Sequence, residues 1–204
     1  SSRIGIRFLI GQHVDIQKES VSETTIGVID THCNPHTVIK HAVEDVQMII
    51  DNIYYKELEI EYDLAKKDYK FLYIPSHLYY IVFEVLKNAG RATSEFTDYT
   101  KPIKIQTSVS KDDFIIKISD NGGGFSRNIM KNIFSFSYTT AEEECENRRI
   151  KIAGYGHGLG LSRIYARYFG GDLTISSVEG VGTDVYIYLN RFGDKNENVA
   201  DNRT

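Results

Sequence analysis

Glycine occupies every second position in one stretch of the chain, which reads Gly154-Tyr155-Gly156-His157-Gly158-Leu159-Gly160. An apolar pattern with helical spacing follows directly, over residues 161–169. Alternating glycines let the backbone turn its N–H groups toward one point, and a helix start adds unpaired donors and partial positive charge. The stretch therefore favours binding of an anion, and we expect a nucleotide phosphate. A flexible hinge is the alternative, since glycine also punctuates loops.

The spacing of these glycines excludes two common nucleotide-binding loops. It matches neither the Walker pattern G-x-x-x-x-G-K-[ST] nor the G-x-G-x-x-G of a dinucleotide-binding fold. A different kind of phosphate site is therefore predicted.

A second candidate is an acidic residue followed by three glycines, Asp120-Asn121-Gly122-Gly123-Gly124. It comes directly after residues 113–119, whose alternating apolar side chains predict a half-buried strand. A carboxylate at a strand end can accept a hydrogen bond from the amino group of adenine, while glycines let the backbone pass close to a flat base. Asp120 is therefore the candidate adenine-binding residue. An ordinary Asp-Asn-Gly turn is the alternative.

A third candidate is one face of a helix predicted over residues 78–93. At about 100° per residue, Val82, Val85, Leu86 and Ala89 share one side, and Glu84, Lys87, Asn88 and Arg91 share the other. An amide oxygen such as that of Asn88 suits Mg²⁺, which takes few protein ligands beside phosphate and water. Glu84, one turn earlier, can deprotonate a hydroxyl or water that attacks a terminal phosphate. The alternative is a solvated polar face.

The order of these segments resembles that of a known superfamily. Glu84-x-x-x-Asn88, Asp120-x-Gly122-x-Gly124, Gly154-x-Gly156-x-Gly158 and Gly182-Thr183 resemble the N, G1, G2 and G3 boxes of the GHKL ATPases. Within that superfamily, the residues in and around these boxes are most similar to the mitochondrial pyruvate dehydrogenase kinase and branched-chain α-ketoacid dehydrogenase kinase family. The similarity is closest to pyruvate dehydrogenase kinase. The segments that carry this likeness are Tyr73-Ile74-Pro75-Ser76-His77-Leu78 and residues 3–13, 83–93 and 162–173.

The resemblance implies roles for particular residues. Glu84 would be the general base for a substrate serine, Asn88 the Mg²⁺ ligand and Asp120 the adenine contact. Lys87 and Arg91 would lie near the phosphates and ribose, and Thr183 would contact adenine from beneath. The implied ATP site is Glu84, Lys87, Asn88, Arg91, Asp120, Gly122, Gly124, Thr139, Thr140, Gly154, Tyr155, Gly156, His157, Gly158, Leu159 and Thr183.

The resemblance also implies a function, with ATP and Mg²⁺ as cofactors. A kinase of this family phosphorylates a serine of the E1α subunit of the pyruvate dehydrogenase complex in the mitochondrial matrix and inactivates the complex. The implied partners are E1α, the lipoyl domain of E2 and a second copy of the chain in a homodimer. A branched-chain α-ketoacid dehydrogenase kinase, a histidine-kinase-like sensor with His13 as acceptor, and an ATP-driven switch remain alternatives.

Some positions depart from the family pattern. Tyr80 stands where many animal members have a histidine one turn before the general base, so this chain has no imidazole at that position to tune Glu84. Gly158-Leu159-Gly160-Leu161-Ser162 is more typical of histidine kinases. The chain has no tryptophan, and therefore lacks the Asp-Trp motif of the animal members' tails.

Composition limits the possible classes of protein. The 204 residues are 41% hydrophobic and 25% charged, which is enough for one main folded domain. No apolar run is long enough to span a membrane, and a net charge of −4 disfavours nonspecific binding to nucleic acid. Cys33 and Cys145 lack metal-ligand spacing, and two cysteines in a chain of this size favour a reducing compartment with no disulfide framework.

We expect a GHKL (Bergerat) ATP-binding fold of the α/β class, an α+β sandwich with a mixed sheet and helices on one face. Residues 1–19 would be the remnant of an amino-terminal helical bundle, 20–193 the ATP-binding kinase domain and 194–204 a disordered tail. A helix is predicted from Pro35 to Ile53, and another after Pro75. Strands are predicted over 58–62, paired with 69–74, and in two hairpins, 103–109 with 114–119 and 172–177 with 183–189.

Overall fold

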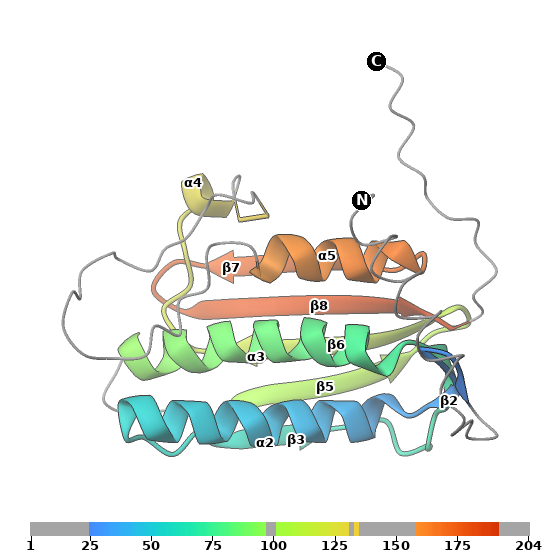
Figure 1. Cartoon of the computed structure of the whole chain (residues 1–204). Helices are drawn as coiled ribbons and strands as arrows, with labels where there is room; N and C mark the ends of the chain where they lie inside the picture. Colours follow the sequence, from blue (N-terminus) through green and yellow to red (C-terminus); the bar gives the residue numbers. More distant parts are fainter. Residues whose placement is uncertain (1–24, 97–100, 131–132, 135–157, 192–204) are drawn as a thin grey trace.

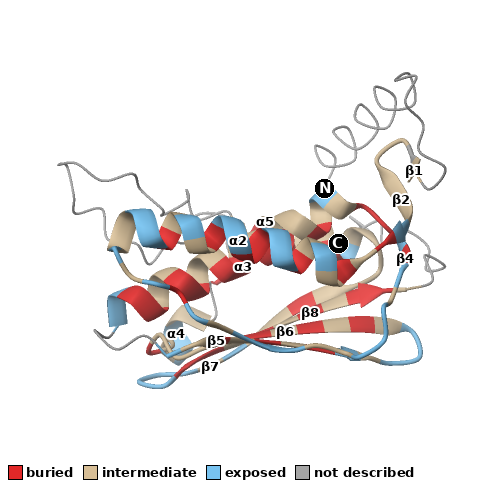
Figure 2. Ribbon diagram, turned by 90° about the horizontal axis from the view of Figure 1, so that it is seen from below, coloured by how far each residue is buried: buried red, intermediate tan, exposed pale blue. Residues whose placement is uncertain are grey.

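The computed structural model describes residues 25–96, 101–130, 133–134 and 158–191. Its helices are α2 (Pro35–Tyr54), α3 (Pro75–Phe96), α4 (Arg127–Met130) and α5 (Gly158–Tyr168). Its strands are β1 (Thr25–Ile26), β2 (Ile29–Cys33), β3 (Ile60–Asp63), β4 (Phe71–Tyr73), β5 (Ile103–Val109), β6 (Asp113–Asp120), β7 (Asp172–Val178) and β8 (Gly182–Asn190). Helices α2, α3 and α5 lie side by side on one face of a sheet (Figures 1 and 2). This arrangement confirms the predicted α/β layering.

The larger sheet is mixed, as predicted. Its strand order is β3-β5-β6-β8-β7, in which β3 runs parallel to β5 and every other pair is antiparallel. The pairs β5–β6 and β7–β8 are the two predicted hairpins. Strand β8 lies between them and joins them into one sheet.

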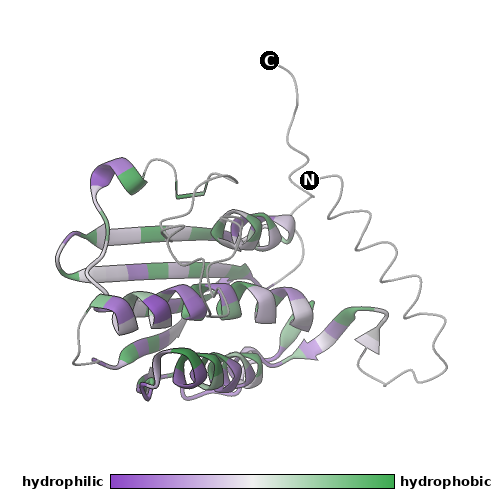
Figure 3. Cartoon of the chain, turned by 60° about the vertical axis from the view of Figure 1, so that its left-hand side comes forward, coloured by the Kyte–Doolittle hydropathy of each residue, from purple (hydrophilic) through white to green (hydrophobic). Residues whose placement is uncertain are grey.

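The core lies between this sheet and the helices. Along β6, Phe114, Ile116 and Ile118 are at most 1% exposed, and they alternate with half-buried residues that point to the other face. Helices α2 and α3 supply the matching apolar faces, so apolar positions recur along the elements that enclose the core (Figure 3). Full burial of one such side chain contributes roughly 1.5–3 kcal/mol, and this packing therefore fixes the helices on the sheet.

Local signals begin the two long helices where the sequence predicts. Before α2, the Asn34 side chain accepts hydrogen bonds from the N–H groups of His36 (3.0 Å) and Thr37 (3.3 Å). Pro35 and Pro75 each occupy the first helical position, where the missing N–H would have no partner in any case. These caps set the direction in which each helix leaves its preceding strand.

The predicted pairing of residues 58–62 with 69–74 is wrong. Strand β3 pairs in parallel with β5, so that Ile60 lies opposite Ile103, whereas β4 pairs with β2 in a separate three-stranded sheet. Both β2 and β4 lead directly into helices, and these helices begin at the same end of the helical layer (Figure 1). Because α2 and α3 pack side by side, the strands that enter them meet and pair.

Several expectations concern residues outside the described part of the chain. These include the helical remnant over 1–19, His13, Cys145 and the tail over 194–204. Cys33 is described, and it is a free, buried thiol. Within the described residues, no helix combines the length and the apolar character that crossing a lipid bilayer requires.

Candidate nucleotide-binding site

The polar face of α3 forms as the helical spacing predicts. Val82, Val85, Leu86 and Ala89 are at most 4% exposed, whereas Glu84, Lys87, Asn88 and Arg91 are half-buried. The apolar side packs into the core, so the opposite side of the helix carries the four candidate residues.

Glu84 and Lys87 form an ion pair in this face. The Lys87 Nζ lies 2.7 Å from Glu84 Oε1, and the two side chains are only 13% and 12% exposed. An ordinary solvated face would leave such long side chains in water. The withdrawal of this pair from solvent therefore favours a site over a solvated helix surface.

The start of α5 lies against the same carboxylate. Gly158 is the first residue of α5, and a Cβ atom at this position would overlap Glu84 Oε2. Any larger residue here would therefore force the Glu84 carboxylate or the start of α5 to shift. The structure thus brings together Glu84 and the carboxyl-terminal part of the glycine-rich stretch. Contrary to the expectation of a loop up to residue 160, residues 158–160 already belong to the helix.

Asp120 lies at the end of β6, and Thr183 lies directly opposite it on β8. Burial raises the pKa of the Asp120 carboxyl to about 6, although hydrogen bonds from the backbone N–H groups of Gly122 and Thr183 oppose this increase. The Gly122 N–H donates to Asp120 Oδ1 at 2.8 Å. This hydrogen bond forms the Asp-Asn-Gly turn that is the alternative to an adenine site. The turn accounts for the hydrogen bond to one carboxylate oxygen of Asp120, but a turn alone does not require that the carboxylate be buried.

Thr183 is held by its neighbours in the sheet. It is 6% exposed, and its Oγ1 lies 3.1 Å from Ser177 Oγ on β7. Ser177 also accepts the N–H of Phe125 at 2.9 Å. Ser177 was not predicted, because only the β7–β8 register brings it beside Thr183.

The glycines after Asp120 are explained by packing within the chain. A Cβ at position 122 would overlap Ala92 at the end of α3. Gly124 has a φ of +59° and lies against the carbonyl oxygens of Val178 and Gly182. The sequence suggested that these glycines make room for a base. In the described structure they let the end of β6 fit between α3 and the β7–β8 turn.

Asn88 and Arg91 share the polar face of α3 with Glu84, but they lie in different surroundings. The Asn88 side chain makes no hydrogen bond with the described residues. Arg91 is one of the charges that act on Tyr54, whose hydroxyl donates to Glu95 at 2.6 Å. Arg91 therefore lies toward the α2 side of the site.

Tyr80 lies one turn before Glu84. Its ring meets that of Tyr165 on α5 edge-on, with 5.3 Å between ring centroids. Burial, and then the negative charge of Glu84, raise the pKa of the Tyr80 hydroxyl to about 12. This residue therefore keeps its proton at neutral pH and remains uncharged.

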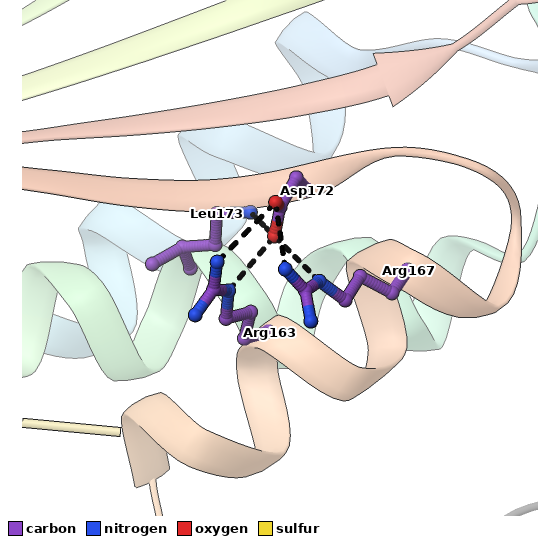
Figure 4. Close-up of polar contacts among 4 residues, drawn as sticks. All are labelled: Arg163, Arg167, Asp172 and Leu173. Atoms are coloured by element: carbon purple, nitrogen blue, oxygen red, sulfur yellow. Dashed lines mark hydrogen bonds and ion pairs between the residues drawn. The ribbon is translucent and has the colours of Figure 1, made fainter. Parts of the chain in front are cut away.

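A second set of charged residues links α5 to β7 through ion pairs. These ion pairs were not predicted from the sequence. Arg163 and Arg167 on α5 both bind the carboxylate of Asp172, the first residue of β7 (Figure 4). The available signal was the spacing of four between the arginines, followed by an acidic residue after Gly170-Gly171.

Six of the predicted site residues lie outside the described part of the chain: Thr139, Thr140, Gly154, Tyr155, Gly156 and His157. Within the described part, no group of three or more histidine, cysteine or acidic residues is placed to hold a metal ion. An Mg²⁺ ion that binds together with phosphates needs only one or two protein ligands, and the Asn88 amide fits that requirement.

Comparison with known proteins agrees with this geometry. Residues 73–192 match the family described as "Histidine kinase-, DNA gyrase B-, and HSP90-like ATPase". Because this match covers more than half of the 204 residues, the chain belongs to this family of ATPases.

The chain is also similar to particular kinases. It is 41% identical to "[Pyruvate dehydrogenase (acetyl-transferring)] kinase, mitochondrial" of Arabidopsis thaliana, over 96% of this chain and 57% of the relative. The kinase of the same name from Schizosaccharomyces pombe is 41% identical, over 96% of this chain and 49% of the relative. Human isozyme 3 is 40% identical, over 93% and 50%. The chain thus spans about half the length of these curated relatives.

Proposed function

We propose that this chain is the ATP-binding part of a protein serine kinase that phosphorylates the E1α subunit of the pyruvate dehydrogenase complex and inactivates the complex. The observation that carries the proposal is the position of Glu84. Its carboxylate is largely withdrawn from water, is paired with Lys87, and lies against Gly158, where α5 begins within the glycine-rich stretch. The names of the relatives support the substrate.

The two ends of the nucleotide would be bound by different elements. Asp120 on β6 accepts a hydrogen bond from the adenine amino group, beside Thr183 on β8. The N–H groups at the start of α5 and in residues 154–157 bind the phosphates, because a helix start offers unpaired donors to an anion. Lys87 adds a positive charge at this end. When bound, ATP and Mg²⁺ supply the transferable phosphoryl group and a cation that neutralises charge on its oxygens.

Glu84 would act on the protein substrate. Its carboxylate accepts the proton of the substrate serine hydroxyl and orients that oxygen toward the terminal phosphorus. The ion pair with Lys87 and the close approach of Gly158 limit the rotation of the side chain. Since phosphoryl transfer depends mainly on positioning and charge, a fixed carboxylate beside the phosphate end is the contribution required from the protein.

The kinase would act in the mitochondrial matrix, with the E2 lipoyl domain and a second copy of the chain as partners. The relatives are named as mitochondrial kinases, which supports a role in the mitochondrial matrix, beside the complex. The lipoyl domain of E2 would be a further partner, bound mainly through an amino-terminal domain rather than through the ATP-binding domain. A homodimer is supported by the sheet itself, because none of the described helices covers its second face (Figure 2).

Phosphate transfer from radiolabelled ATP to purified E1α tests the proposal. Label on serine of pyruvate dehydrogenase E1α supports it, and preferential labelling of the branched-chain E1α would transfer the proposal to that complex. Labelling of His13 would identify a histidine-kinase-like sensor. Binding or hydrolysis of ATP without transfer to any of these acceptors would identify an ATP-driven switch.

A further inference from the structure

Asp172 is a junction between α5 and the sheet. Arg163 donates from its Nε to Oδ1 at 2.9 Å and from a terminal nitrogen to Oδ2 at 3.4 Å. Arg167 does the same at 2.9 and 3.1 Å, and the N–H of Leu173 donates to Oδ1 at 2.8 Å (Figure 4). Burial acts to raise the pKa of the Asp172 carboxyl, but the hydrogen bonds of the arginines outweigh it and hold this pKa well below its usual range. The junction is therefore ionised at neutral pH.

The two arginines are not equivalent. The Arg163 side chain is 28% exposed, whereas that of Arg167 is 53% exposed. The guanidinium carbon of Arg163 also lies 4.4 Å from the centre of the Phe134 ring. Phe134 in turn packs against the hydrophobic core. Arg163 therefore connects α5 both to β7 and to a third segment of the chain, whereas Arg167 contacts Asp172 at the more exposed end of the junction.

The position of Arg163 along α5 links this junction to the candidate site. Arg163 lies in the second turn of the eleven-residue helix, and Gly158, at the helix start, lies against Glu84. A short helix moves as a rigid body, so a rotation or shift at Arg163 is transmitted to the first turn. The adenine end of the site lies on β6 and β8, and neither strand receives a hydrogen bond from Arg163 in the described structure.

We propose that Arg163 is a positioning residue for the phosphate end of the nucleotide, a role that rests on the proposed function of the site. By binding Asp172 and stacking on Phe134, it holds the first turn of α5 where its N–H groups face the phosphates. Arg163 itself does not contact the nucleotide. Loss of this residue therefore weakens binding of ATP and leaves binding of adenosine unchanged.

Calorimetric titration of the chain with Mg-ATP, and displacement titration with adenosine, test this role. Arg163→Met is compared with Arg167→Met, which also removes one arginine from Asp172 but leaves the Phe134 contact intact. We expect Arg163→Met to weaken ATP binding by about five- to tenfold, Arg167→Met by less than about threefold, and neither to change adenosine binding by more than about twofold.

A second variant separates the stacking contact from folding. Phe134→Leu removes the ring without touching Arg163 or Asp172, and it should weaken ATP binding in the same direction as Arg163→Met. In the double variant Arg163→Met/Phe134→Leu the two losses should not add, whereas those of Arg167→Met and Phe134→Leu should add. Phe134→Trp provides a fluorescence readout of the contact, since the chain contains no other tryptophan.

The outcomes distinguish this role from the proposed function. Equal losses of ATP affinity in Arg163→Met and Arg167→Met, or equal losses for ATP and adenosine, would show a general structural role and overturn the proposal. If Arg163→Met fails to fold, unchanged ATP binding by a folded Phe134→Leu variant overturns it equally. Failure of the unsubstituted chain to bind either ligand would instead contradict the proposed function.

Discussion

Asp120 and Thr183 face each other across the antiparallel pair of β6 and β8, at the end of the sheet that the β7–β8 turn approaches. Their side chains arise from strands that are separated by more than sixty residues in the sequence. Because the sheet register fixes both residues, the adenine end of the proposed site is part of the rigid core of the fold.

Substitution of Asp120 should abolish most nucleotide binding. Asp120→Ala removes a charged acceptor whose hydrogen bond contributes about 1.5–3 kcal/mol, so the Kd for ATP should rise by about ten- to a hundredfold. Calorimetry with Mg-ATP measures this change. Asp113→Asn, at the other end of the same strand, is the matched control and should bind normally. Wild-type affinity in Asp120→Ala would remove this residue from the adenine contact.

The raised pKa of Asp120 predicts a pH dependence of the free energy of unfolding in the absence of nucleotide. The folded chain holds the proton of this carboxyl more tightly than the unfolded chain, with a pKa of about 6 against 3.8. The free energy of unfolding should therefore contain a contribution that is fully present below pH 4 and is lost as the pH rises to about 6. That contribution is at most about 3 kcal/mol.

Urea unfolding at several pH values measures this dependence. Asp120→Asn carries no titrating carboxyl at this position, so its free energy of unfolding should lack the decrease between pH 4 and pH 6. If the variant and the wild type show the same pH profile, the pKa of Asp120 is not raised in the folded chain.

Glu84→Gln should separate binding from transfer. The amide keeps the size of the side chain, so the Kd for ATP should remain within about threefold of wild type. Transfer to serine should fall by about 10²- to 10⁴-fold, because glutamine cannot accept the hydroxyl proton. Transfer kinetics with radiolabelled ATP check this expectation, and Glu44→Gln on the exposed side of α2 serves as control. Unimpaired transfer by Glu84→Gln would exclude Glu84 as the base.

Gly158→Ala should disturb both functions of the site. The added Cβ overlaps Glu84 Oε2, so either the carboxylate or the first turn of α5 must move. Overpacking of this kind costs about 1–3 kcal/mol, which corresponds to about a five- to hundredfold weaker ATP binding if the helix moves.

A double variant identifies the cause. Glu84→Ala/Gly158→Ala removes the side chain that the new methyl group meets, and it should therefore recover the ATP affinity that Gly158→Ala loses. An equally weak double variant would mean that the contact between Glu84 and Gly158 does not control the position of the helix.

Much of the fold could be predicted from the sequence, because local patterns determine it. The alternation in residues 103–119 and 172–189 gives the two hairpins, and Pro35 and Pro75 mark the starts of two helices. The partners of β3 and β4, which are β5 and β2, could not be predicted, since two short strands carry little information about the strands they pair with. It depends on how α2 and α3 pack, which is a property of the assembled layers.

The candidate site was predictable in its parts but not in its connections. Helical spacing alone placed Glu84 and Lys87 on one face. The helical conformation at Gly158 was missed, because glycine disfavours helix and the alternating pattern resembles a loop. The contact of Arg163 with Phe134 joins residues that no local spacing relates. Contacts of this kind arise only when the layers are assembled.

The phenol of Tyr80 gives Glu84 a neighbour whose charge does not change between pH 6 and pH 8. With a pKa of about 12, this side chain is neutral at pH 6 and equally neutral at pH 8. An imidazole at the same position would gain a positive charge over that interval and would alter the basicity of the carboxylate one turn away. In this chain the electrostatic field that Tyr80 exerts on Glu84 is constant across the physiological range, and proton concentration cannot act on the base through this neighbour.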